Sequence, residues 1–336
     1  MARKKVTLDD IARETGLSKY SISRALAGKP GVSEETRQKV MAACNALGYI
    51  KKDQASPVTP DRYVVMLIPQ NDAQDPSFWM KVILGVESEL NKNHYTLRLR
   101  VIEQMVEGRV DNELREASAI IFAGYKSLPW VPKLKDLQKP VMVMTYPPHN
   151  MFGYDTICLS DREGACVLCE KMISMGHKKI AYFGPMDRPS MKKRFDGIYE
   201  AVKDSDAQIV AVWDRSNYYE AEDIYTELEE RKEKGTLPSL IMCSTDAYAQ
   251  SLMFILNKLG LRIPHDISVT GFNSDLDSTL PIPFTSMGIS KKRYGEAAVY
   301  HLMHRIQRPD MPVRRIYLSP QMCLSETTRV VGEADR

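Results

Sequence analysis

The sequence predicts two structural units: a small all-α module of three helices, and after it an α/β region of two lobes, each built on a doubly wound parallel sheet. Two observations predict this arrangement. In residues 7–47 the apolar positions recur at helical spacing, with a glycine at the break between the first two helices. From residue 63 onward, short apolar runs alternate with amphipathic ones, and 336 residues are enough for both units.

The first helix is expected to begin after Thr7, because Thr7 and Asp10 have the spacing of a capping box. Gly16 can adopt the left-handed conformation that ends a helix, and the hydroxyl of Ser18 can accept a backbone N–H to start the next one. The inward face of this helix and its turn consists of Leu8, Ile11, Ala12 and Leu17. The break between the two helices is therefore encoded locally.

The second helix presents a polar and cationic outer face, which suits a DNA groove. Its inward positions are Ile22, Ala25 and Leu26. Its outer face consists of Lys19, Tyr20, Ser21, Ser23 and Arg24. A third helix is predicted between Ser33, its cap, and Gly48, with a buried stripe formed by Val40, Ala43 and Leu47.

The charge distribution points to a nucleic-acid partner. Residues 1–52 carry 11 Lys+Arg against 5 Asp+Glu, a net charge of +6, so the remainder carries −3 of the formal total of +3. A basic end neutralises phosphates, and such binding weakens steeply with salt because counterions are released. The alternative is a three-helix module for protein contacts, whose Lys and Arg side chains form only a solvated face.

The α/β region is predicted from eight apolar runs that read as strands, with helical patterns between most of them. The strand candidates are residues 63–69, 95–102, 119–125, 140–146, 178–184, 207–213, 237–244 and 266–272; the helical examples are 78–93, 246–260 and 291–306. This alternation implies parallel sheets covered on both faces, and the strands are too many for one compact sheet. Because ligands of such folds bind outside the carboxyl ends of the strands, we expect a small-molecule cleft between two lobes.

Other classes of protein find little support. No stretch approaches the ~20 apolar residues that span a bilayer, and the first ten residues lack the apolar run of a signal peptide, so we expect a cytoplasmic protein without membrane contact. The sequence contains neither GxxxxGK[ST] nor GxGxxG, and no Ser/His/Asp or paired-carboxylate arrangement stands out. We therefore expect no catalytic residues.

The cysteines and histidines predict no metal site and no cofactor. Cys166 and Cys169 form a CxxC motif, but it lies in a helical run without a second Cys or His pair, so packing is the expected role. His301 and His304 share a helix face, which is weak evidence for a metal. The six cysteines are expected to be reduced thiols; they are Cys44, Cys158, Cys166, Cys169, Cys243 and Cys323.

The amino-terminal segment, TLDDIARETGLSKYSISRALAGKPGVSEETRQKVMAACNALGYI, resembles the helix-turn-helix domain of the LacI/GalR regulators. In the family pattern Lys19, Tyr20 and Arg24 match positions that reach base edges, while Thr7 and Ser23 match positions that touch phosphates. Arg24 is the best candidate for base readout, because arginine pairs bidentately with guanine. The resemblance implies a homodimer, with a tetramer as the alternative, on a pseudo-palindromic operator.

Four later segments, residues 75–87, 159–185, 194–202 and 244–287, are similar to the LacI/GalR sensor domain, which resembles periplasmic binding proteins. The resemblance implies a small-molecule effector between the lobes: a sugar, a sugar phosphate or a sugar acid. The residues that match its cleft positions are Phe78, Trp79, Arg188, Arg194, Thr245, Asp246 and Asn273. Ordinary structural roles are the alternatives: a helix cap for Asp246, a turn for Asn273, and core packing for Phe78 and Trp79.

Three departures from the family pattern matter. The family usually has an acid where Asn273 stands, so a plain neutral sugar is a less secure expectation. The loop PMDRPSMKKRF is expected to gather Arg188, Lys192, Lys193 and Arg194, which suggests an anionic effector, with a solvated charge run as the alternative. The stretch between residues 102 and 119 is shorter than the family's usual passage, which leaves the geometry of a dimer open.

The linker is the weakest part of the resemblance. Family members usually carry a hinge helix here, whose leucine enters the minor groove. This chain has Pro57 within the segment and Val58 in place of that leucine, and proline inside a helix removes a hydrogen bond and clashes with the preceding turn. With Pro60 also present, we expect an extended or broken connector, weaker bending of the operator and weaker coupling of that bending to the sensor domain.

These observations favour a transcriptional regulator, which we expect to be a repressor, whose operator affinity depends on a small-molecule effector. The expected boundaries are a DNA-binding domain at 1–50, a linker at 51–62 and an effector-binding and dimerisation domain at 63–336. Its first subdomain is expected at about 63–160 plus 290–320, and its second at about 161–289 plus 321–336. The alternatives are a solute-binding receptor for sugars, which has no use for the basic module, and an enzyme on nucleotides or sugars.

Overall fold

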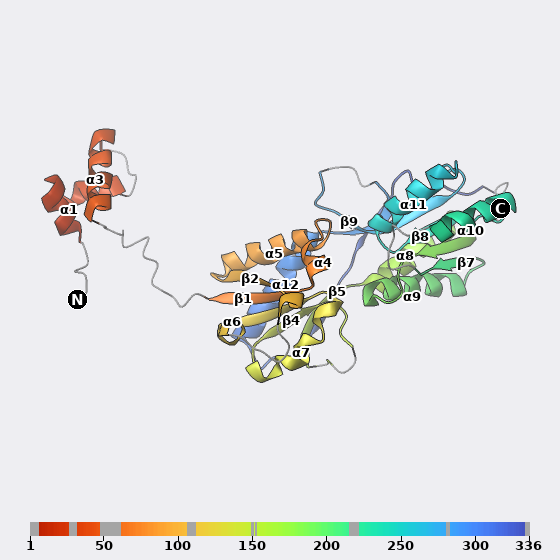
Figure 1. Ribbon diagram of the computed structural model, residues 1–336, viewed down its shortest axis with the longest axis horizontal. Helices are drawn as coiled ribbons and strands as arrows, with labels where there is room; N and C mark the ends of the chain where they lie inside the picture. Colours follow the sequence, from red (N-terminus) through yellow and green to blue (C-terminus); the bar gives the residue numbers. More distant parts are fainter. Residues whose placement is uncertain are drawn as a thin grey trace. The chain divides into compact units, whose positions relative to one another are not determined.

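A computed structural model describes residues 7–26, 32–47, 62–105, 112–148, 151, 153–214, 222–279 and 283–332 (Figure 1). The chain divides into two compact units, Met1–Asp61 and Arg62–Arg336. The predicted linker at 51–62 lies almost entirely outside the described residues, and with it the expectations for Pro57, Val58 and Pro60.

The first unit contains the three predicted helices, α1 (Leu8–Thr15), α2 (Lys19–Leu26) and α3 (Glu34–Leu47). Asp10 accepts a hydrogen bond from the backbone N–H of Thr7 at 2.8 Å, as the predicted capping box requires. Gly16 ends α1 in the left-handed conformation, with φ 69° and ψ 15°. The helices enclose one small core, formed by Ile11, Ile22, Ala25, Val40, Ala43 and Cys44.

The second unit has two lobes, and the first lobe contains a parallel sheet in the order β11-β5-β4-β3-β1-β2. Its strands are β1 (Tyr63–Ile68), β2 (Thr96–Val101), β3 (Ala119–Ala123), β4 (Val141–Met144), β5 (Asp155–Leu159) and β11 (Arg315–Leu318). Its longer helices are α5 (Trp79–Lys92) and α12 (Lys291–Gln307). The shorter ones are α4 (Gln70–Ala73), α6 (Asn112–Glu116), α7 (Trp130–Lys133), η1 (Ile102–Gln104), η2 (Tyr125–Ser127) and η3 (Lys135–Leu137).

The second lobe contains a sheet in the order β12-β10-β9-β8-β6-β7. Its strands are β6 (Lys179–Phe183), β7 (Gln208–Trp213), β8 (Leu240–Cys243), β9 (Ser268–Asp275), β10 (Thr285–Ile289) and β12 (Gln321–Cys323). Its helices are α8 (Asp161–Ser174), α9 (Pro189–Lys203), α10 (Glu222–Glu233) and α11 (Asp246–Lys258). Only the short edge strand β12 is antiparallel to its neighbour, so the predicted parallel character holds for the rest of the described sheet.

The two predicted lobes are thus confirmed, although the apolar runs missed β5, β10, β11 and β12. The missed strands have few consecutive apolar residues: none of β5 (DTICL), β10 (TSMGI), β11 (RIYL) and β12 (QMC) contains an apolar run of four. The main chain passes between the lobes after β5, after β10 and after β11. We keep the predicted subdomain boundaries, 63–160 plus 290–320 and 161–289 plus 321–336, as a proposal.

Helices α5 and α12 of the first lobe pack against each other through two glycines. A Cβ atom on Gly85 would lie 2.0 Å from the carbonyl oxygen of Lys292, and one on Gly295 would lie 2.1 Å from that of Val82. Only glycine permits backbones to approach this closely. The contact places the first turns of both helices, which carry cleft residues, side by side (Figure 1).

None of the helices in the described ranges has the length and apolar character needed to cross a membrane. Within the same ranges, no group of three or more His, Cys, Asp or Glu side chains has the arrangement of a metal site. The six cysteines are free thiols, and Cys169 lies on the buried face of α8, in the core of the second lobe.

Candidate functional site

Two regions carry the predicted site residues, and the first is the outer face of α2. Lys19, Tyr20 and Ser23 are exposed, and Ser21 and Arg24 are half-buried. The guanidinium of Arg24 donates a hydrogen bond of 3.0 Å to the Tyr20 hydroxyl and lies over its ring. These two side chains therefore form one projecting donor group, the kind of group that reaches base edges.

The other residues predicted for this face have local partners. Lys19 forms an ion pair of 2.6 Å with Asp9 of α1, and both side chains are more than half exposed. The hydroxyl of Ser18 accepts a hydrogen bond of 3.1 Å from the backbone N–H of Ser21, so Ser18 starts α2 as predicted. Thr7 is exposed at the start of α1.

The second region is a cavity of about 610 Å³ in the α/β unit. Its walls come from the ends of β1, β3, β4 and β5 in the first lobe and from the ends of β6, β8 and β9 in the second. All the residues predicted for a cleft lie on these walls; they are Phe78, Trp79, Arg188, Arg194, Thr245, Asp246 and Asn273. The carboxyl ends of parallel strands thus meet at one cleft, where such folds bind ligands.

Arg194 is the most constrained of these residues, with 3% of its surface exposed. Its guanidinium donates to Asp161 at 2.7 Å, to the carbonyl oxygen of Ser244 at 2.6 Å and to the amide oxygen of Asn273 at 3.0 Å. It also stacks on the ring of Phe272, 3.9 Å from the centroid. Protein groups therefore already occupy most of the donors of Arg194.

Sequence reasoning missed Asp161, the ion-pair partner of Arg194, which is 2% exposed. The one signal in the sequence was a carboxylate directly before the helical run that contains Cys166 and Cys169. Because Asp161 begins α8 and Arg194 belongs to α9, their pair also joins the two helices.

Asp246 and Thr245 occupy the start of α11. Thr245 is the cap, since its hydroxyl accepts a hydrogen bond from the N–H of Tyr248, so the capping alternative considered for Asp246 belongs to its neighbour. The Asp246 carboxylate accepts hydrogen bonds from Ser274 at 2.6 Å and Ser286 at 2.8 Å. Burial raises the pKa of Asp246, and the two hydroxyl groups oppose this shift.

The two aromatic residues Phe78 and Trp79 occupy different environments, the cavity wall and the core respectively. Trp79 is 9% exposed and belongs to the core of the first lobe. Phe78 is half-buried and meets Trp79 edge to face, with 5.4 Å between the ring centroids. Of the two, Phe78 presents more surface to the cavity, and aromatic faces of this kind stack on apolar faces of ligands.

The expected cluster of four cations is not what the cavity contains. Of these four residues, Arg188 and Arg194 line the cavity. Lys192 pairs instead with Asp196 on its own helix, and Lys193 is exposed. A helix turn separates side chains that are adjacent in sequence, because successive residues point 100° apart around the axis.

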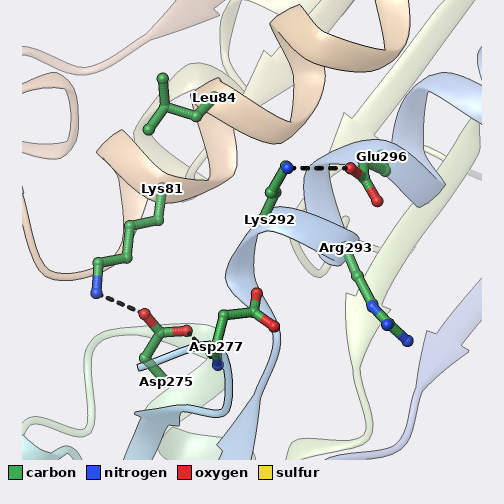
Figure 2. Close-up of a pocket in the computed structure, with 7 residues that line it drawn as sticks. All are labelled: Lys81, Leu84, Asp275, Asp277, Lys292, Arg293 and Glu296. Atoms are coloured by element: carbon green, nitrogen blue, oxygen red, sulfur yellow. Dashed lines mark hydrogen bonds and ion pairs between the residues drawn. The ribbon is translucent and has the colours of Figure 1, made fainter. Parts of the chain in front are cut away.

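A second cavity of about 520 Å³ adjoins the starts of α5 and α12 (Figure 2). Lys81 and Asp275, which line both cavities, form an ion pair of 2.5 Å between α5 of the first lobe and β9 of the second. Burial raises the pKa of Asp275, but the hydrogen bonds from Lys81 and from the backbone of Asp277, with the charges of Lys291 and Lys81, together lower it below its usual value. This pair therefore ties the lobes together at the edge of the cleft.

Two family models match the chain: bacterial regulatory proteins of the lacI family over residues 7–52, and the periplasmic binding protein-like domain over residues 169–328. The PurR transcriptional repressor of Vibrio vulnificus is 27% identical, across 97% of this chain and 99% of its own length. A lac repressor dimer bound to operator and the anti-inducer ONPF superposes with a TM-score of 0.65, at 20% identity over 97% of this chain and 100% of that one. A complex of the regulator CelR with cellobiose superposes with a TM-score of 0.64, at 20% identity over 96% of this chain and 100% of that one.

The fold and the two regions define a class of protein: a helix-turn-helix DNA-binding module joined to a two-lobe domain of the periplasmic-binding-protein type. The chain carries a lacI-family DNA-binding domain and a periplasmic binding protein-like domain, and its relatives are LacI-type transcriptional regulators. These matches confirm the resemblance inferred from the sequence. They do not support the alternative, a solute-binding receptor without a regulatory role. The relatives are regulators rather than enzymes.

Proposed function

We propose that this regulator is a repressor that binds a pseudo-palindromic operator as a homodimer. Lys19, Tyr20 and Arg24 read base edges in the major groove, while Thr7, Ser18, Ser21 and Ser23 contact phosphates or fix the helix against them. The observation that carries this proposal is the exposed face of α2, where Arg24 and Tyr20 project together from a packed three-helix core. Two-fold symmetry in the protein then matches two-fold symmetry in the site.

Selection of bound sequences from random DNA with the full chain tests this proposal. We expect an enriched palindrome with two half-sites, and affinity that falls steeply with salt. Recovery of no common sequence, or of a single half-site bound by a monomer, would contradict it. Because the target is DNA, we place the protein in the cytoplasm.

The effector is proposed to be a sugar or sugar derivative held in the 610 Å³ cavity. Support comes from the half-buried ring of Phe78, from the polar groups at the strand ends, and from the cellobiose bound by the related regulator CelR. An anionic effector has less support. Four cations line the cavity, and three of them, Arg194, Lys81 and Lys291, have protein partners in the described structure, which leaves Arg188.

Effector binding is proposed to change how the lobes close, and thereby the DNA affinity. The coupling is reciprocal and is typically ~1–3 kcal/mol, so the effector must bind one lobe arrangement better than the other. Calorimetric titration with cellobiose, D-gluconate and D-glucose 6-phosphate tests the effector class. Binding of the neutral sugar alone would exclude the anionic alternative, and turnover of a bound compound would revive an enzymatic role.

A further inference from the structure

Asp72 is a cavity residue to which the sequence pattern assigned no role. It lies in α4, directly after β1, and lines the 610 Å³ cavity from the first lobe. Its carboxylate rests over the backbone of Gly124, where a Cβ atom would lie 2.2 Å from Asp72 Oδ2. The bare glycine thus provides the room in which this carboxylate sits at the cavity wall.

Every other carboxylate of the cavity has a partner within the protein. The pairs are Asp161 with Arg194, Asp246 with Ser274 and Ser286, Asp75 with Ser77, and Asp275 with Lys81. Within the described part of the chain, the Asp72 carboxylate forms no hydrogen bond and no ion pair. Among the carboxylates that line this cavity, Asp72 is therefore the one that remains available to accept a hydrogen bond from a ligand.

An unpaired carboxylate at such a site costs stability. Burial raises the pKa of Asp72 to about 6; of the nearby charges, Arg188 and Lys126 lower the pKa, while Asp75 and Glu103 raise it. Arg188 faces the same cavity from the second lobe, just before α9. A destabilising group held in a cleft is typical of ligand-binding positions, where stability is given up for function.

We propose that Asp72 determines effector specificity by accepting a hydrogen bond from a hydroxyl or amino group of the effector. The effector then presents a donor to Asp72 on the first lobe and an acceptor to Arg188 on the second, so it contacts both lobes at once. This inference rests on the proposed function, in which the cavity holds the effector. It favours a hydroxyl-rich or amino sugar and disfavours any compound with an acidic group at the Asp72 end.

The test compares the full-length wild type with Asp72→Asn and with Asp136→Asn, a control that removes an exposed carboxylate of η3. Calorimetric titrations use D-ribose, cellobiose, D-glucosamine, D-gluconate and D-glucose 6-phosphate. For the compound that binds the wild type most tightly, we expect Asp72→Asn to raise Kd at least tenfold and Asp136→Asn to leave it unchanged. Thermal unfolding of the ligand-free proteins provides a second, independent readout.

In the absence of ligand, Asp72→Asn should unfold at a higher temperature than the wild type at pH 7.5, because it removes an ionised, unpaired carboxylate. The difference should shrink at pH 4.5, where Asp72 is largely protonated. An unchanged Kd, or a lower unfolding temperature at pH 7.5, overturns the role of Asp72. If no compound binds either protein, the proposed effector class fails, and the unfolding comparison then decides the role of Asp72.

Discussion

The side-chain amide of Asn273 is oriented by Arg194, whose guanidinium Nη2 lies 3.0 Å from the amide oxygen. A guanidinium can only donate, so the amide oxygen must face it and the NH₂ group must point elsewhere. Asn273 therefore offers a donor where the family pattern has an acid. The position also has φ 77°, a left-handed conformation that asparagine tolerates better than most residues.

Arg194→Ala should destabilise the α/β unit by about 3–5 kcal/mol, because it leaves Asp161 buried without its partner. Urea denaturation of the full chain measures the effect. Lys193→Ala, at an exposed position one residue earlier, should change stability by less than about 0.5 kcal/mol. Loss of effector binding at unchanged stability would instead assign Arg194 to the ligand alone.

Gly295→Ala should also destabilise the first lobe, by about 1–3 kcal/mol or more, although the same change in an open helix is stabilising. The added methyl group would lie 2.1 Å from the carbonyl oxygen of Val82 and force α5 and α12 apart. Gly153→Ala is the matched control, since its added carbon would meet nothing within 4 Å. Equal unfolding midpoints for the two variants would refute the close-packing argument.

His177 should make the free energy of unfolding depend on pH. Its ring is fully buried between Ser239 and the carbonyl oxygen of Arg329, and burial lowers its pKa to about 4. Between pH 6.5 and pH 4 the unfolded chain binds this proton and the folded chain does not. The contribution of His177 to the free energy of unfolding is thus complete above pH 6.5. It decreases by roughly 2–4 kcal/mol as the pH falls towards 4.

The free energy of unfolding of the wild type and of His177→Gln, measured at pH 7.5 and pH 4.5, checks this expectation. The variant should be less stable at pH 7.5, and its deficit should narrow at pH 4.5. A deficit of the same size at both pH values would show that His177 does not titrate differently on folding.

Arg24→Ala should weaken specific operator binding by ~1–3 kcal/mol and relax the preference at one base pair. Thr7→Ala, at a predicted phosphate contact, should weaken specific and random DNA alike. Competition of both duplexes for each variant distinguishes the two effects. Equal losses on specific and random DNA for Arg24→Ala would argue against base readout by this residue.

Much of the fold could be predicted because local chemistry specifies it. Thr7, Asp10 and Gly16 encode the first helix and its end, and the central strands are apolar enough to be recognised alone. The short strands β10 and β11 could not be predicted this way, since their formation depends on neighbours supplied by distant parts of the chain. The sequence also predicted that Lys192 clusters with Arg194, whereas Lys192 pairs with Asp196 one helical turn away, a local pairing that follows from helix periodicity.

The sequence by itself determined the class of this protein, because capping, helical periodicity and the order of βα units are properties of neighbouring residues. It also placed polar groups at the strand ends, where the cleft forms. Only the tertiary structure decided which of them remain available: Arg194 and Asp246 are engaged by partners from other elements, while Asp72 has none among the described residues. Pairing over such distances depends on how helices and sheets pack, and the linear order of residues does not record it.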